Sequence, residues 1–185
     1  MSRRKSLVQM LASCEKHDFD KVVRAYLKDV YSYTRIVQTD GKDDCGLDVK
    51  VFDFSDSKIQ YQMTIQKSST AAEMTSLSNK IFEDVAKAKN NTEEYGWSNK
   101  LIFFYSYELT NKKIREFERR ALGEFGINLE IIDANRIAEE SEEYLELQKA
   151  IYETSGIAEF KLKQSLYDDE NNNLIYDFPV EHLVV

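Results

Sequence analysis

The stretch Lys100-Leu101-Ile102-Phe103-Phe104-Tyr105 decides the fold, because it is apolar on both faces of a strand. Such a strand needs an apolar cover on each side, which is typical of sheets with helices above and below them. Apolar residues at helical spacing occur on either side of it along the chain, over residues 73–90 and 111–125. A strand placed between two such helices favours an α/β fold.

The pattern continues downstream of the second helix. Gly126 is placed to end that helix, and residues 127–132 predict the last strand. Asp133 is placed to cap an acidic helix that begins at Ala134. The order strand, helix, strand, helix is therefore complete in this half of the chain.

Upstream, the period of the pattern changes from helix to strand. Apolar spacing over residues 7–27 predicts two opening helices, or one that is interrupted near His17-Asp18. Residues 34–38 predict a short strand, and the runs 46–54 and 59–66, joined by a polar turn, predict a hairpin. Together with the downstream elements, this predicts a three-layer α/β/α sandwich with a central mixed β-sheet.

The second strand of the hairpin has one apolar and one polar face. The apolar face carries Ile59, Tyr61, Met63 and Ile65, and the polar face carries Gln60, Gln62, Thr64 and Gln66. A polar row of this kind ordinarily faces solvent from an antiparallel sheet. Here the strand at residues 100–105 needs helices on both sides, so a polar row inside the sandwich indicates a cleft.

Length and composition limit the class of protein. The chain has 185 residues, 42% of them apolar, which fits a soluble globular protein with its main domain over residues 1–157. Residues 158–185 are expected to form a C-terminal extension or the beginning of a further region. The net charge of -8 argues against a broad basic surface that coats nucleic acid, although it leaves room for a local site. With no apolar run long enough to cross a bilayer, we expect a cytoplasmic protein without membrane contact.

The cysteines and histidines offer no familiar cluster. Cys14 and Cys45 have no cysteine or histidine neighbour at a metal-binding spacing, so neither a disulfide scaffold nor structural zinc is expected. His17 and His182 lie near opposite ends of the chain, which disfavours a nucleophile-histidine triad. A glycine-rich phosphate loop is also absent, which leaves a small-molecule enzyme without support.

The strongest chemical signal lies on the predicted hairpin. Asp43-Asp44-Cys45-Gly46-Leu47-Asp48 leads into the first strand, and Gln62-Met63-Thr64 lies on the second. An aspartate at the start of a strand and an amide on its hairpin partner can converge on one divalent cation, because hard ions such as Mg²⁺ take oxygen ligands. An ion of this kind polarises a phosphate and lowers the pKa of a bound water, as phosphodiester hydrolysis requires.

With these residues the chain resembles the restriction-endonuclease-like superfamily, whose signature is PD-(D/E)xK, and more closely its Mrr-like branch. That branch has Phe-Glu on an early helix, an Asp-x-Gly-Ile-Asp strand entry and then Gln-x-Lys. Phe19-Asp20, Asp44-Cys45-Gly46-Leu47-Asp48 and Gln62-Met63-Thr64 stand at the three places. The order of elements through about residue 140 is also similar.

The resemblance implies a metal-dependent nuclease in which Asp48 is the principal Mg²⁺ ligand, Gln62 is a second ligand and Asp20 assists from the helix. The chain departs from the pattern at Thr64, where the family has a lysine that orients the attacking water and stabilises charge on the phosphate. Lys67 is our first choice for that role, because the strand is expected to end near it. Lys50, on the Asp48 face of its strand, is the alternative.

Two functions follow from these residues. The first is a DNA endonuclease that uses Mg²⁺ or Mn²⁺ in prokaryotic restriction or antiphage defence, acting as a homo-oligomer or within a larger defence assembly. The second is a catalytically inactive module with the same fold that binds nucleic acid or protein, an interpretation that the missing lysine favours.

Several charged residues also have plainer interpretations. Asp20 is expected to be an exposed carboxylate near a helix N-terminus. Lys80, Lys87 and Lys89, like the arginines at 115, 119 and 120, are expected to be solvated or to meet a phosphate backbone.

Overall fold

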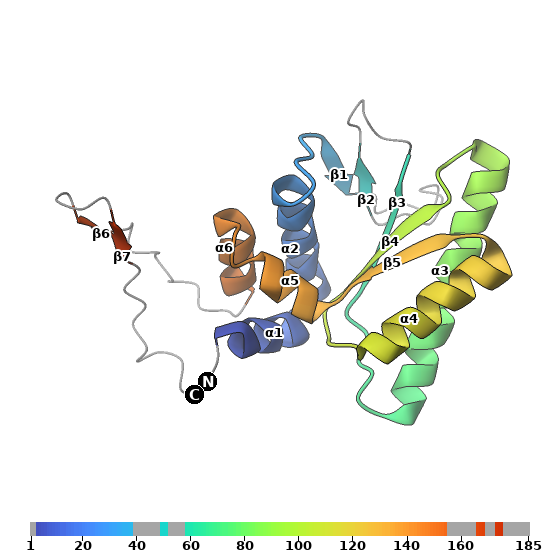
Figure 1. Ribbon diagram of the computed structural model, residues 1–185, viewed down its shortest axis with the longest axis horizontal. Coiled ribbons are helices and arrows are strands. Elements are labelled where there is room, and N and C mark those ends of the chain that lie inside the picture. Colours follow the sequence, from blue (N-terminus) through green and yellow to red (C-terminus); the bar gives the residue numbers. More distant parts are fainter. Residues whose placement is uncertain (1–2, 39–48, 52–57, 155–165, 169–172, 176–185) are drawn as a thin grey trace.

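The computed structural model describes residues 3–38, 49–51, 58–154, 166–168 and 173–175. Within these ranges the chain forms an α/β fold with three parallel strands and six α-helices (Figure 1). The main sheet has the order β1-β2-β3-β4-β5. Its strands are β1 (Ile36–Gln38), β2 (Val49–Val51), β3 (Gln60–Thr64), β4 (Lys100–Tyr105) and β5 (Asn128–Ile132).

The sheet is mixed, as the sequence predicted. β1 pairs with β2 and β2 with β3 in antiparallel fashion, with Val49 opposite Tyr61 in the second pair. β3, β4 and β5 are parallel, and the register places Gln62 opposite Phe103 and Thr64 opposite Tyr105. Side chains of paired residues lie on the same face of a sheet, so these pairs decide which helices each residue meets.

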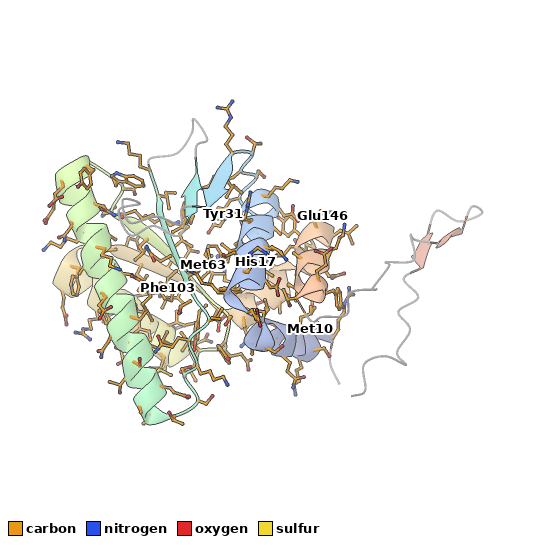
Figure 2. All side chains as sticks on the ribbon, turned by 180° about the vertical axis from the view of Figure 1, so that it is seen from behind. Met10, His17, Tyr31, Met63, Phe103 and Glu146 are labelled. Carbon is orange, nitrogen blue, oxygen red and sulfur yellow. The ribbon has the colours of Figure 1, made fainter. Side chains whose placement is uncertain are left out.

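Helices cover both faces of the sheet. One face carries Ile102 and Phe104 and packs against α1 (Arg3–Ser13), α2 (Lys16–Asp29), α5 (Ala134–Glu140) and α6 (Leu145–Glu153). The other face carries Leu101, Phe103 and Tyr105 and packs against α3 (Ala71–Tyr95) and α4 (Asn111–Arg120). Figure 2 shows α2 and α3 on opposite sides of β3, with Met63 labelled between them. The two-sided apolar pattern of residues 100–105 thus predicted the arrangement correctly.

Local capping signals explain where the helices differ from the predicted ranges. α3 is longer than 73–90 because Thr70 and Glu73 form a capping box at its start and Gly96, at φ 64°, ends it. α4 continues through a π-helical turn, Ala121–Phe125, and Gly126 at φ 71° ends that turn.

One other helix prediction needed correction. The acidic helix expected from Ala134 is divided into α5 and α6, since Ser141 caps the first and Tyr144 precedes the second. The opening segment forms two consecutive helices, which confirms the first of the two alternatives, and they are separated at Cys14-Glu15.

A second, two-stranded antiparallel sheet lies near the C-terminus. It pairs β6 (Leu166–Asp168) with β7 (Asn173–Ile175), while residues 176–185 lie outside the described residues. In the part of the chain that the structure describes, none of the helices has the length and apolar character to cross a membrane. Cys14 is a buried free thiol whose Sγ donates to the Leu11 carbonyl oxygen, and burial raises its pKa to about 12.

A buried glutamine joins β3 to the last turns of α3. The Gln60 side chain is fully buried, and its Nε2 donates to the carbonyl oxygens of Ala88 and Ser98, each at 2.9 Å. Its Oε1 accepts a hydrogen bond from Asn91 Nδ2 at 2.9 Å. Since a buried amide is costly unless its polar atoms are paired, these contacts fix the position of α3 along β3.

Replacing Gln60 by alanine should lower the free energy of unfolding by about 3 kcal/mol, because Asn91 and two carbonyl groups would lose a buried partner. Urea denaturation followed by circular dichroism measures the change. Glu83→Ala, on the exposed side of α3, is the control and should stay within about 0.5 kcal/mol of the parent. A loss of stability for Gln60→Ala no larger than that of the control would contradict the role of Gln60 in fixing α3 along β3.

Candidate functional site

The structure describes some of the predicted site residues. Gln62 and Thr64 lie on β3, Lys67 follows that strand, and Asp20 lies on α2. Asp48 lies outside the described residues, as does the rest of the strand entry at residues 43–47. The side chain of Lys50 is likewise outside what the structure describes. The predicted roles of Asp48 and Lys50 therefore stay predictions.

Gln62 lies inside the fold on the α3 side of the sheet. Gln62 is 4% exposed and Gln60 is fully buried, whereas Thr64 and Gln66 are half-buried, so the expected enclosure of the polar row holds for its first two residues. In the described part of the chain, the Gln62 amide has no hydrogen-bond partner, whereas Gln60 on the same face has several. An amide that the described residues leave unpaired can bind a ligand.

Asp20 is buried, 6% exposed, in contrast to the expected solvated carboxylate. It lies on α2, whose buried residues join the cluster that contains Tyr61 and Met63. Gln62 is on the opposite face of the sheet, in register with Phe103. The two predicted metal ligands therefore belong to different layers, and Asp48, which would have to join them, is outside the described residues.

Thr64 ends the strand. Its Oγ1 accepts a hydrogen bond from the Gln66 backbone N–H at 3.3 Å, so its hydroxyl serves the turn that follows β3. Lys67 lies beyond this turn and is exposed. The strand thus ends close to Lys67, as expected, but the structure gives that ammonium no contact with Gln62.

Tyr105 holds the segment after β3. Its hydroxyl donates to the Gln66 carbonyl oxygen and lies at hydrogen-bond distance from Ser68 Oγ, both at 2.8 Å. A hydroxyl has a single proton, so the Ser68 hydroxyl donates in return. Burial raises the pKa of Tyr105 to about 12, and the hydrogen bond from Ser68 acts in the opposite direction.

A polar stripe on α3 faces this part of the sheet. Its members are spaced by four, four and seven residues, which keeps them on one flank of the helix: Ser76, Lys80, Asp84 and Asn91. Its two ends contact the polar row of β3, because Gln66 Nε2 donates to Ser76 Oγ and Asn91 donates to Gln60. The apolar flank holds Phe82, whose ring packs against Phe117 of α4.

These two contacts fix which residue of α3 lies beside each residue of β3 between them, and we call this position along the helix the level of the residue. From Gln60 to Thr64 the strand advances about 13 Å, which equals about nine residues of helix. Because α3 runs antiparallel to β3, Thr64 is level with about residue 81 and Gln62 with about residue 85. We call this interface the polar seam: Gln60, Gln62, Thr64 and Gln66 on one side, and Ser76, Lys80, Asp84 and Asn91 on the other.

Asp84 is the most buried charge in the seam. Its side chain is 0% exposed, and its Oδ1 accepts hydrogen bonds from Lys80 Nζ at 3.0 Å and Lys87 Nζ at 3.3 Å. Its Oδ2 lies 2.8 Å from Lys80 Nζ, but at an angle outside hydrogen-bond geometry. A carboxylate is seldom buried unless it is paired, and Asp84 forms an ion pair with Lys80, whose side chain is partly exposed.

Sequence reasoning missed Asp84, and it described Lys80 and Lys87 as solvated or as meeting a phosphate backbone without predicting their contact with a buried carboxylate. A signal was present, because Asp84 lies seven residues after Leu77 and four before Ala88, on the apolar stripe of the helix. A charge at such a position is exceptional and indicates a buried partner or a ligand.

A hollow lined by residues of α4 and of the π-helical turn after it lies away from the seam. It has a volume of about 670 Å³ and is lined by Lys112, Arg115, Glu116, Arg119, Arg120, Gly123 and Glu124. Arg120 stacks on Phe82 and pairs with Glu124, so it is held within the fold. Among the described ion pairs, none involves Lys112, Arg115 or Arg119.

Comparisons with known proteins assign the chain to no family. No model of a known protein family matches the chain, and no curated protein is similar to it. Within the described residues, no group of three or more histidine, cysteine, aspartate and glutamate side chains is placed to hold a metal ion. The carboxylate and amide oxygens predicted at Asp48 and Gln62 are nevertheless the donor types that a hard cation takes.

Replacing Tyr105 by phenylalanine should remove the contacts to Gln66 and Ser68 and lower the free energy of unfolding by about 1 kcal/mol at neutral pH. The parent should also lose stability between pH 10.0 and about 12, since Tyr105 ionises there in the unfolded chain but not in the folded one. The variant should lose less over that window.

Urea denaturation at several pH values measures both effects. Tyr107→Phe, which removes a hydroxyl from the neighbouring ring, is the matched control. Equal losses of stability for the parent and Tyr105→Phe across the window would contradict the assignment.

Proposed function

We propose that the chain is a Mg²⁺-dependent nuclease domain that hydrolyses phosphodiester bonds of DNA, with Asp48 and Gln62 as the residues that hold the ion. Mn²⁺ has the same ligand preference and should replace it. When bound, the ion polarises the phosphate and lowers the pKa of a water. Asp20 lies on the other face of the sheet from Gln62, so the proposal does not include it as a ligand.

The observation that carries this proposal is the burial of Gln62. Gln62 is 4% exposed, its amide makes no hydrogen bond to another described residue, and it lies on the face of the sheet that packs against α3, where the buried Asp84 pairs with the partly exposed Lys80. A purely structural glutamine would be satisfied as Gln60 is. A free oxygen donor in a polar seam is what an active site for a charged substrate needs.

The proposal gives separate roles to residues of β3, β4 and the segment after β3. Asp48 and Gln62 would hold the ion through a carboxylate and an amide oxygen. The apolar side chains of β4, among them Phe103, exclude water from one side of the seam and strengthen electrostatic contacts there. Tyr105 and Ser68 fix the segment after β3, so that its backbone does not move as the substrate binds.

The fold agrees with this function. We propose that it is a three-layer α/β/α sandwich of the restriction-endonuclease-like kind. The support is a mixed sheet in which two antiparallel pairings precede parallel β3, β4 and β5, with helices on both faces. The proposal includes a role in restriction or antiphage defence and self-association or a larger assembly, because one such site cuts one strand.

The alternative is a catalytically inactive module that binds nucleic acid. The observation that favours it is the α4 hollow, where Lys112, Arg115 and Arg119 have no described ion-pair partner and can meet phosphates. Glu116 and Glu124 also line that hollow. The two functions differ in whether DNA is cut after it is bound.

Supercoiled plasmid incubated with the pure protein should be nicked and linearised in Mg²⁺ or Mn²⁺ and remain intact in EDTA. Asp48→Ala and Gln62→Leu should each slow cleavage by on the order of 100-fold or more, since even indirect support of a metal site commonly contributes that much. The readout is the band pattern on an agarose gel over time.

Glu83→Ala is the control for this experiment and should cleave as the parent does. Cleavage by Asp48→Ala at the parent rate would exclude the proposed site. Binding of plasmid without cleavage in either metal would favour the inactive module.

A further inference from the structure

We propose that Lys80 of α3 is the ammonium that contacts the scissile phosphate, in place of a lysine on the strand, and that Asp84 positions it. The inference rests on the proposed function and goes beyond the predicted residues, among which Lys67 was first choice for this role. It names a charged group that lies on a different element, packed against the same strand.

The first support is the level of Lys80 along the seam. The hydrogen bonds of Gln60 place Thr64 opposite about residue 81 of α3. The contact between Gln66 and Ser76 gives the same result from the other end of the seam. Lys80 is therefore the helix residue beside Thr64, where a charged donor is missing from the strand. Gln62 lies less than two helical turns away on the same face.

The second support is the way the ammonium is held. Lys80 Nζ contacts both oxygens of a fully buried carboxylate, at 2.8 and 3.0 Å, while 33% of the Lys80 side chain remains exposed. The group is thus fixed on the inner side and open on the outer side. A preorganised charge of this kind stabilises a developing negative charge without reorganisation during the reaction.

The third support is the contrast with other lysines nearby. Lys67 is exposed beyond the end of β3. Lys87 contacts only one oxygen of Asp84, at 3.3 Å, and its side chain is 51% exposed. It also lies nearer the Gln60 end of the seam, away from Thr64. Lys80 alone combines the level of Thr64 with a fixed ammonium in the described part of the seam.

The test compares Lys80→Gln with Lys87→Gln. Each variant removes one lysine contact of Asp84, and the new amide can still donate to the carboxylate, which protects the fold. Cleavage of plasmid should fall by on the order of 10²- to 10³-fold for Lys80→Gln and stay within about threefold of the parent for Lys87→Gln. Circular dichroism and thermal melting verify that both variants fold.

Rescue provides a result that a structural role would not give. Thr64→Lys places an ammonium on the strand at the same level, so Lys80→Gln combined with Thr64→Lys should recover at least about tenfold of the lost rate. If Asp84 acts through Lys80, then Asp84→Asn should slow the parent but have little further effect in the rescued variant. Cleavage by Lys80→Gln at the parent rate would overturn the proposal, and so would a slow Lys80→Gln variant whose rate Thr64→Lys does not raise.

A binding measurement separates this inference from the proposed function. Anisotropy of a fluorescein-labelled DNA duplex, measured in EDTA over a range of salt, should show that Lys80→Gln lowers the slope of log K against log salt by about 0.9, the value for one lost phosphate contact. Lys87→Gln should leave the slope unchanged. An unchanged slope for Lys80→Gln overturns the role of Lys80, whereas a parent that binds but does not cleave in Mg²⁺ or Mn²⁺ overturns the proposed hydrolysis.

Discussion

The arrangement of the seam depends on one constraint, the need of the fully buried Gln60 amide to find partners inside the fold. Its donors and acceptor are satisfied at one longitudinal position of α3, where Ala88, Asn91 and Ser98 meet them. A shift of the helix by a single turn would leave several buried polar groups unpaired, each at a cost of about 1–3 kcal/mol. The level of Asp84 and Lys80 beside β3 is thereby fixed as well.

The two faces of the sheet have different chemistry for the same reason. β4 is apolar on both sides, and β3 is apolar only toward α1 and α2, where Tyr61 and Met63 join the core. Polar side chains of β3 are therefore confined to the α3 side. Because α3 presents a matching polar flank beside its apolar one, the seam is polar within an otherwise apolar interface.

The sequence was sufficient for the order of elements from α1 through β5, because their signals are local. Two-sided apolarity predicted β4 at its observed residues, and the alternation in residues 59–66 predicted which face of β3 is polar. The ends of α3 were less well predicted, although Thr70 and Glu73 are a readable capping box. The division between α5 and α6 has no comparable local signal, since acidic residues continue across it.

The candidate site was predicted only in part, because its contacts are between distant residues. Gln62 was identified from its place on the hairpin, and it is buried on the α3 side of the sheet. The spacing of four residues indicates that Lys80 and Asp84 can pair, but the burial of Asp84 and the position of Lys80 beside β3 depend on residues far apart in the sequence. A charge on an apolar stripe was the available sign. Asp84 also has two lysine neighbours rather than one, so a change at Lys87 leaves the buried negative charge still compensated by Lys80.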